Sequence, residues 1–358
     1  MARAGISPYA YAPADPAVSR VAPDLAARVP HPDVRTVYPP AAQAVFSAGV
    51  ALGDGERALK ALFALADLSI VGLILALGGE RAGFAAALYA FHPLAILESA
   101  GQGHLDSLGV ALLLASLVLL RRRRPIRSGV AFALSALTKY VSIFAALPLL
   151  RRGRSRWAAA ALVCGAAVWL ASVRGGVPPV GGLGDYATRW EFNSAAYPAL
   201  TSVFERIELP ERAKEAFLNA KAALGHPAWT QSLFPYFYAG FLARAALLLA
   251  LAIVLVAVAL RVEDTEAAVF ASLGALLLAS PTLHPWYLLW VLPFAARRRE
   301  PAFLYLSFAV PLSYGLLYPL AGLPAGVVRL LEYGPFLVLL VGTLARSRRR
   351  PTALGAEA

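Results

Sequence analysis

The sequence has few charged residues and almost no cysteine. Only 15% of its 358 residues are Asp, Glu, Lys or Arg, and Cys164 is the one cysteine. A single cysteine excludes a disulfide framework and a metal site built on several thiolates. Scarce charge, with 59% hydrophobic residues and a mean hydropathy of +0.63, excludes an ordinary soluble domain and is typical of an integral membrane protein.

Several catalytic motifs are also missing from the sequence. It contains no phosphate-binding Walker loop, no Gly-rich dinucleotide fingerprint, no HExxH zinc helix and no GxSxG nucleophile elbow. These absences argue against ATP-driven transport and against serine hydrolysis.

The positive charge is present, but it is gathered in short blocks. The net charge is +12, and arginines cluster at residues 121–124, 151–156, 297–299 and 346–350, beside apolar runs. This placement follows the positive-inside rule, in which arginine-rich segments stay in the cytoplasm. It favours membrane lipids over nucleic acid as the surroundings. The excess of Arg over Lys is typical of a high-GC bacterial gene, which predicts the bacterial plasma (inner) membrane.

Apolar runs of about 20 residues are long enough to cross a bilayer as helices. The runs lie near 57–78, 82–99, 106–120, 157–174, 236–260, 266–283, 285–296, 301–320 and 328–345. They predict an all-α, polytopic, multi-pass helical bundle with roughly ten spans or half-spans.

Residues 1–358 are expected to form one integral membrane domain. The predicted parts are a first extracytoplasmic loop (1–56), N-terminal helices (57–174), a long extracytoplasmic loop (175–235), C-terminal helices (236–345) and a cytoplasmic tail (346–358). With the arginine blocks inside, "GQGHLDS" at 101–107, the loop 175–235 and "SPTLHPWY" at 280–287 all fall outside.

Two segments do not fit a simple count of spans. Residues 128–150 lie between two arginine blocks, so they form either a hairpin of half-helices bent near Lys139, or one span that breaks the positive-inside rule. Residues 1–56 hold no spanning run and no signal peptide. We therefore expect that a first transmembrane helix is missing from the chain.

Three ionisable residues lie together between two apolar runs. They are Glu98, His104 and Asp106. Burial of such side chains at membrane depth costs free energy unless they are paired or hydrated, so we take them as candidate catalytic residues. The plainer alternative is that Asp106, with Ser107, caps the helix that follows.

Lys139, His284 and Tyr287 are candidate substrate-binding residues. Lys139 is deep in an apolar run, where it could snorkel to the interface, pair with an acid or bind a lipid phosphate. His284 stands between two prolines and beside tryptophans; an aromatic belt at the interface explains the tryptophans and Tyr287, but not the histidine.

The loop "GDYATRWEFNSAAYPAL" alternates aromatic and polar residues. Arg189, Trp190 and Asn193 could stack on and hydrogen-bond to a sugar or a lipid headgroup. An interfacial helix is the competing interpretation. Residues 206–223 are predicted to form such a helix along the membrane.

Several stretches carry a resemblance to a known family. "HPLAILESAGQGHLDSLGVALLLASLVLL", a lysine-containing helix, "RWEFN" and "PTLHPWYLLWVLPF" resemble bacterial membrane glycosyltransferases of the GT-C superfamily. These enzymes use polyprenyl-phosphate sugars and are related to mannosyltransferases. "GISPYAYAPADP" and "RTVYPPAAQAVF" are similar to their first outside loop.

The resemblance implies transfer of a hexose, with mannose favoured, from a polyprenyl phosphate to a glycan or lipid acceptor outside the membrane. It implies that Glu98, His104 and Asp106 form the outer polar site and that Lys139 contacts the lipid phosphate. It also implies that His284 lines a second polar side of that site. The family's base is an acid in the first outside loop, and this sequence begins just after that position; Asp15 and Asp33 are the remaining candidates. No metal and no cofactor is expected.

Two other classes of function stay open at this point. Lys139 and Asp106 inside apolar runs would suit a transporter or lipid flippase, although such proteins usually have related halves and no internal symmetry is evident here. A structural polytopic subunit would need none of the three ionisable residues.

Overall fold

The computed structural model describes residues 1, 4–21, 23, 28–53, 55–173, 176–225, 228–317 and 324–349. Across these residues the chain is mainly helical, and an isolated bridge pairs Phe192 and Asn193 with Thr282. The all-α prediction is confirmed. The end of the predicted tail, 350–358, lies outside the described residues.

In chain order, with η marking 3-10 or π helices, the helices are α1 (Pro16–Ser19), α3 (Pro40–Ala51), α4 (Gly55–Ala76), α5 (Ala82–Ala90), α6 (Pro93–Ala95), η2 (Ile96–Gly101), α7 (Asp106–Arg121), α8 (Pro125–Thr138), η3 (Tyr140–Ala145), α9 (Ala146–Ser172), α10 (Leu183–Arg189), α11 (Ala196–Arg206), α12 (Leu209–Ala223), η4 (Ala228–Tyr236), α13 (Ala239–Arg261), α14 (Thr265–Ala279), η5 (Pro285–Trp290), α15 (Leu292–Arg298), α16 (Pro301–Ala309), η6 (Val310–Ser313), α17 (Tyr314–Leu317) and α18 (Ala325–Arg349).

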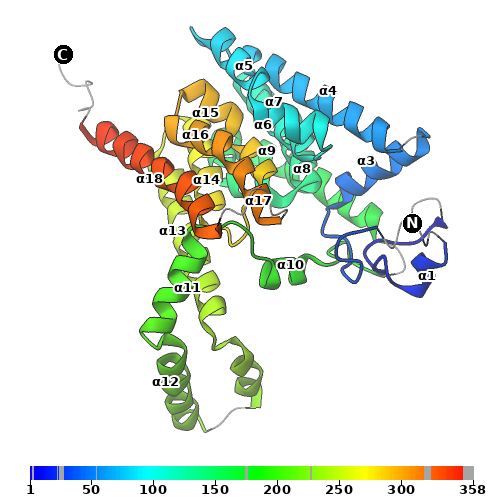
Figure 1. The fold of residues 1–358 in the computed structure, drawn as a ribbon. Coiled ribbons are helices and arrows are strands. Elements are labelled where there is room, and N and C mark those ends of the chain that lie inside the picture. The colour runs from blue at the N-terminus through cyan, green and yellow to red at the C-terminus, as the bar shows by residue number, and fades with distance from the viewer. Residues whose placement is uncertain are drawn as a thin grey trace.

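The chain runs back and forth between two ends of a bundle. One end, which we call the arginine end, carries Arg121, Arg152 and Arg297 around Glu266. The opposite end, the loop end, carries α10, α11, α12 and the N-terminal segment (Figure 1). The two ends separate the arginine blocks from the polar clusters that the sequence singles out.

Four helical stretches are long and apolar enough to cross a membrane by themselves. They are Gly55–Ala76, Tyr140–Ser172, Ala239–Arg261 and Ala325–Arg346, and a fifth span is possible if Pro93–Gly101 and Asp106–Arg121, which are bent by 116°, count as one. Other predicted spans are built from shorter apolar helices, such as Thr265–Ala279 and Pro301–Leu317. Integral membrane helices are therefore present, in fewer unbroken spans than expected.

The predicted run 82–99 is broken for a local reason. His92 precedes Pro93, and the residue before a proline is disfavoured in helical conformation. His92 is accordingly extended, and its side chain accepts a hydrogen bond from the Leu94 amide to start α6. The break turns the chain into η2, a π-helix that contains Glu98.

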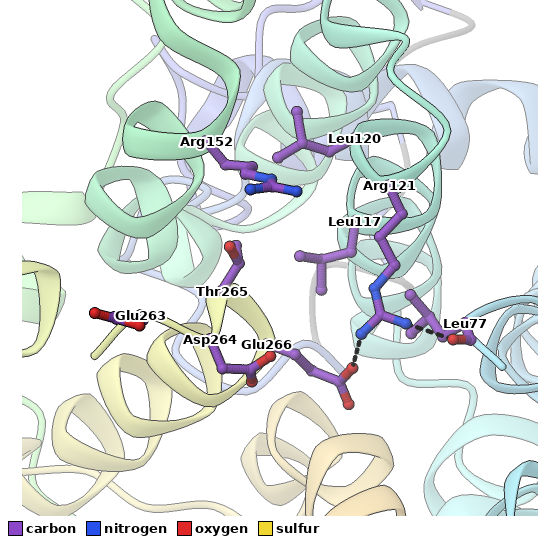
Figure 2. Close-up of a pocket in the computed structure, with 9 residues that line it drawn as sticks. All are labelled: Leu77, Leu117, Leu120, Arg121, Arg152, Glu263, Asp264, Thr265 and Glu266. Atoms are coloured by element: carbon purple, nitrogen blue, oxygen red, sulfur yellow. Dashed lines mark hydrogen bonds and ion pairs between the residues drawn. The ribbon is translucent and has the colours of Figure 1, made fainter. Parts of the chain in front are cut away.

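The segment 128–150 is a hairpin of half-helices. Helix α8 ends at Thr138, Lys139 is extended (φ −155°, ψ 132°), and η3 with the first turns of α9 leads back to Arg152. Arg152 lines the same cavity as Arg121, so both arginine blocks lie at one end (Figure 2). Lys139 therefore sits at the tip of the hairpin.

Helix α7 and the segment η5–α15 form the centre of the core. Trp290 is completely buried and packs against Gly109, where an added Cβ would come within 2.6 Å of the indole. Only glycine allows this approach. It brings the indole alongside α7, next to Asp106.

The long loop forms an arm at the loop end. Glu208 adopts a left-handed conformation (φ 55°) and separates α11 from α12. The predicted helix 206–223 therefore begins at Leu209, because the turn at Glu208 interrupts it. Helix α12 projects beyond the bundle (Figure 1); its contact with a membrane surface stays a prediction.

Candidate active site

Asp106 is the centre of the buried polar groups. It is the first residue of α7 and is 2% exposed. Its carboxylate accepts hydrogen bonds from Lys139 Nζ, at 2.7 and 2.9 Å, and from Trp290 Nε1, at 2.6 Å. No side chain caps α7, whose N-cap is Leu105. The Asp106 carboxylate therefore does not cap α7, and the capping alternative is wrong.

Lys139 reaches the same point from the tip of the 128–150 hairpin. Besides its ion pair with Asp106, its Nζ lies 4.2 Å from the centre of the Tyr287 ring. A cation over an aromatic face is attracted by the ring quadrupole. The Tyr287 hydroxyl is hydrogen-bonded to the hydroxyl of Tyr186 from α10. Lys139 thus pairs with an acid instead of snorkelling.

Glu98 and His104 form a second polar pair beside the first. Glu98 is 0% exposed, and Tyr314 donates its hydroxyl to both carboxylate oxygens, at 2.8 and 3.0 Å. His104 Nδ1 lies 2.9 Å from Glu98 Oε2. Gly103 (φ 75°) makes the turn that folds His104 back, and the His104 amide donates to the Glu98 carbonyl at 2.8 Å.

Four aromatic rings form a continuous stack, which we call the ring stack. His104 stacks on Trp286 (4.0 Å between ring centres), Trp286 on His284 (4.3 Å), and His284 on Phe192 (4.6 Å). These residues come from three segments far apart in the sequence. The ring stack therefore joins the polar clusters near residues 104, 192 and 284 at the loop end.

His284 lies between α14 and η5, in a connecting segment outside the membrane-spanning helices. Burial, followed by the positive charges of Lys139 and His104, lowers the pKa of His284 to about 3. The imidazole is therefore neutral near pH 7. Its buried Nδ1 has no hydrogen-bond partner within the described part of the chain. With its proton on Nε2, the neutral ring can accept a hydrogen bond from a substrate hydroxyl at Nδ1, whereas the lowered pKa makes it a weak base.

The loop around Trp190 is pinned to the segment before His284. The Leu283 amide donates to the Phe192 carbonyl at 2.7 Å, the Phe192 amide donates to the Pro281 carbonyl at 3.2 Å, and Thr282 Oγ1 donates to the Trp190 carbonyl at 3.0 Å. The structure therefore brings the three predicted polar clusters together at one end.

Asn193 is buried behind this loop, in contact with residues that sequence reasoning missed. Its Nδ2 donates to Glu332 Oε2 at 2.7 Å, and Tyr333 donates its hydroxyl to the Asn193 carbonyl at 2.5 Å. Glu332 could have been noticed, because it is an acid inside the apolar run 328–345. Trp290 and Tyr314 carry no comparable signal, since an aromatic residue in an apolar run usually belongs to the core.

A model of Glycosyltransferase family 87 matches residues 36–281, which is most of the chain. The chain belongs to Glycosyltransferase family 87. The family is of the GT-C type, so the resemblance seen in the sequence is confirmed, and the protein is a membrane glycosyltransferase. Searches of curated proteins and of solved structures find no match.

Part of the candidate site lies inside the stretch that matches family 87 and part outside it. Glu98, His104, Asp106 and Lys139 fall within 36–281, whereas His284, Tyr287 and Glu332 follow it. The fold nevertheless places both groups around the same ring stack and ion pair.

The remaining predicted site residues of this family 87 protein lie nearer the surface. The Arg189 side chain is 79% exposed and lies 3.7 Å from Asp185. The Trp190 ring contacts His31 at 4.7 Å and Tyr186 at 5.1 Å between ring centres. Trp190 therefore connects His31 of the first loop with Tyr186, which is hydrogen-bonded to Tyr287 beside Lys139.

Asp15 and Asp33, the candidate bases, lie in the first loop. The Asp15 carboxylate accepts a hydrogen bond from the Ala12 amide at 2.5 Å, and Asp33 is exposed. The Ala14 amide donates to the Pro32 carbonyl at 2.8 Å, which brings the two acidic segments side by side. Among the described contacts, neither acid touches Asp106 or Glu98.

Over the residues that the structure describes, no group of three or more His, Cys, Asp or Glu side chains is arranged to hold a metal ion. Open cavities among the described residues of this family 87 protein lie at its other end. One cavity of about 210 Å³ is lined by Arg121, Arg152 and the segment Glu263 to Glu266 (Figure 2).

Glu266 holds the arginine end together. Its carboxylate pairs with Arg121 at 2.9 Å and with Arg297 at 2.6 Å. Arg297 also donates to the carbonyls of Ile74 and Gly78, both at 3.0 Å. These arginines satisfy helix-end carbonyls and a buried acid, so they are structural and distinct from the candidate active site.

Proposed function

We propose that this glycosyltransferase moves a hexose, with mannose as the favoured sugar, from a polyprenyl-phosphate donor to a hydroxyl of a glycan or lipid acceptor. The reaction takes place at the loop end, which faces the extracytoplasmic side of the bacterial plasma membrane. The observation that carries the proposal is the Lys139–Asp106 ion pair next to the ring stack, with both at the end opposite the arginines. No ATP-binding motif is needed, because the donor is already activated.

The proposed chemistry needs two kinds of group. The bond from the sugar's C1 to the phosphate oxygen breaks, the phosphate leaves with the electron pair, and the acceptor oxygen bonds to C1 while its proton passes to a base. A cation near the leaving phosphate stabilises the charge that develops there. Lys139 supplies this cation, and Asp106 with Tyr287 holds it in place.

Glu98, His104 and Asp106 are proposed to orient the sugar and its acceptor. Glu98 and Asp106 already accept hydrogen bonds from Tyr314, Lys139 and Trp290, which leaves them less free to take a proton. The unpartnered Nδ1 of neutral His284 is a further acceptor in the same place. Asp15 and Asp33 stay proposals for the base.

Trp190 and Asn193 belong to the loop that covers these groups, and Arg189 is on its exposed side. Trp190 offers an aromatic face next to His31 and Tyr186, a surface on which the apolar face of a sugar ring can stack. We assign this surface, with Arg189 at its rim, to the acceptor. Family membership supports this assignment over a transporter or flippase.

The experiment is a transfer assay with the full chain in proteoliposomes. Labelled polyprenyl-phosphate mannose, glucose and arabinose are offered separately, with membrane lipids and glycans as acceptors. We expect label in the acceptor fraction, strongest with mannose, and a loss of at least about 100-fold in Asp106→Ala. Glu205→Ala, an exposed acid on α11, is the matched control and should transfer normally. Movement of the donor across the bilayer without transfer of sugar would refute the proposal.

A further inference from the structure

Asn193 has a conformation that its surroundings must hold. Its φ is 47°, in the left-handed region, although it is not a glycine, and the residue is 2% exposed. This conformation costs most non-glycine residues about 1–2 kcal/mol; Asn tolerates it better than other side chains, and neighbouring contacts can hold it in place. The strained residue directly follows Phe192, the last ring of the ring stack.

Two consecutive residues of α18 hold Asn193. Glu332 is 0% exposed and accepts from Asn193 Nδ2 at 2.7 Å, while Tyr333, 6% exposed, donates to the Asn193 carbonyl at 2.5 Å. One contact fixes the side chain and the other fixes the backbone. Together they determine both the position and the orientation of residue 193.

A buried acid at this place is costly, which argues that its contact has a use. An ionisable residue in a membrane helix is expensive unless it is paired, and such residues commonly mark functional sites. The side-chain oxygen of Asn193, Oδ1, is buried and has no hydrogen-bond partner among the described residues. An apolar side chain at 332 would fill the space without this cost.

Asn193 is connected to His284 through its neighbour Phe192. Phe192 is paired through its backbone with Pro281 and Leu283, and its ring stacks on the imidazole at 4.6 Å. A shift at Asn193 therefore moves the Phe192 ring, and with it one wall of the space around His284. Helix α18 thereby reaches the site through Asn193.

We propose that Glu332 and Tyr333 are positioning residues that clamp Asn193 and so hold Phe192 against His284. This inference deepens the proposed function and rests on it for its effect on transfer. The clamp itself is a structural property that can be measured without any sugar donor. It also assigns a role to α18, which lies outside the stretch matching the family.

Hydrogen exchange tests the clamp in the full chain. The reporters are the amides of Phe192 and Leu283, which form the bridge, with the buried Leu273 amide of α14 as the internal reference. In Tyr333→Phe and Glu332→Leu we expect the two reporters to exchange about tenfold faster, which corresponds to about 1.4 kcal/mol, with Leu273 unchanged. Glu332→Gln keeps an oxygen acceptor for Asn193 and should exchange like the wild type.

Tyr305→Phe is the matched control. It also removes one tyrosine hydroxyl, but a different one. The Tyr305 hydroxyl donates to the Leu331 carbonyl at 2.7 Å and joins α16 to α18 without contacting the loop. The control should leave both reporters and transfer unchanged. Tyr333→Phe and Glu332→Leu should lower kcat about tenfold with little change in the donor KM, because the phosphate contact at Lys139 is intact.

The outcomes separate the two claims. Equal acceleration of exchange in Tyr305→Phe and Tyr333→Phe, or acceleration at Leu273 as well, would show ordinary packing and overturn the clamp. Faster exchange at the loop with full kcat would overturn the positioning role. Absence of transfer by the wild type would refute the proposed function, while the exchange comparison would still decide for or against the clamp.

Discussion

At the residue scale, the main feature is that the buried charges of the predicted site, Glu98, Asp106 and Lys139, are paired with other groups. Asp106 and Lys139 are 33 positions apart and share two hydrogen bonds. Removal of one partner of a buried ion pair costs about 3–5 kcal/mol, because the other charge is left unpaired in a medium of low dielectric constant. Loss of activity in a single variant therefore mixes stability with chemistry.

A double variant separates these two effects. Asp106→Asn keeps an oxygen for Trp290 but leaves Lys139 without a countercharge, so we expect a loss of about 3 kcal/mol in unfolding free energy together with loss of transfer. Asp106→Asn combined with Lys139→Met removes both charges and should recover at least half of that stability without recovering transfer. Thermal unfolding in detergent and the transfer assay provide the two measurements. Transfer by the double variant would show that the pair is only structural.

At the element scale, short breaks in apolar helices place the site. The break at His92 and Pro93 creates η2, the turn at Gly103 redirects the chain into α7, and the extended Lys139 ends α8. Each break leaves a polar or charged side chain at the loop end. The sequence indicated the turn near Gly103 and offered a hairpin near Lys139 as one of two alternatives, but it treated 82–99 as one run, because the composition of that run is largely apolar.

The turn at Gly103 yields a prediction with a close control. Gly103 has φ 75°, and a Cβ there would approach Lys60 Cγ at 3.0 Å. Gly103→Ala should lower the unfolding free energy by about 1–2 kcal/mol and reduce transfer by displacing His104. Gly83→Ala, in α5 with no atom within 4 Å of the added Cβ, should be neutral or stabilising by up to about 1 kcal/mol. Thermal unfolding compares them; equal effects would contradict the role of the turn.

At the scale of the whole molecule, the two ends differ in chemistry. The arginine end is held by Glu266 and its arginine partners and carries the cavity drawn in Figure 2. The loop end carries the ring stack, the ion pair and the arm of α11 and α12 (Figure 1). Trp190 packs on Tyr186, which is hydrogen-bonded to Tyr287, and the Tyr287 ring faces Lys139.

Cysteine labelling tests the orientation of the two ends. In a Cys164→Ser background, a membrane-impermeant maleimide should label cysteines placed at the exposed positions Gln102 and Ala187 in intact spheroplasts. Cysteines placed at Arg123 and Arg156 should react only after the membrane is opened. Labelling of positions 102 and 187 from opposite sides would refute a single extracytoplasmic site.

The sequence by itself determined the class of the protein. Apolar runs of membrane length and arginine blocks depend on composition and short spacing, and they were sufficient for an all-α membrane protein. The GT-C type came from the resemblance of short motifs, such as those around residues 98–106 and 281–290, to a known family. They were also sufficient to select Glu98, His104, Asp106, Lys139 and His284 as the polar residues of interest.

Only the tertiary structure decided which groups meet. The pairing of Asp106 with Lys139 and Trp290, the contact of Asn193 with Glu332, and the stack from His104 to Phe192 join segments far apart in the chain. Such pairings depend on where helices break and how closely they pack, as at Gly109 against Trp290. Local sequence cannot encode these distances, because a contact between remote segments is set by the packing of the whole bundle.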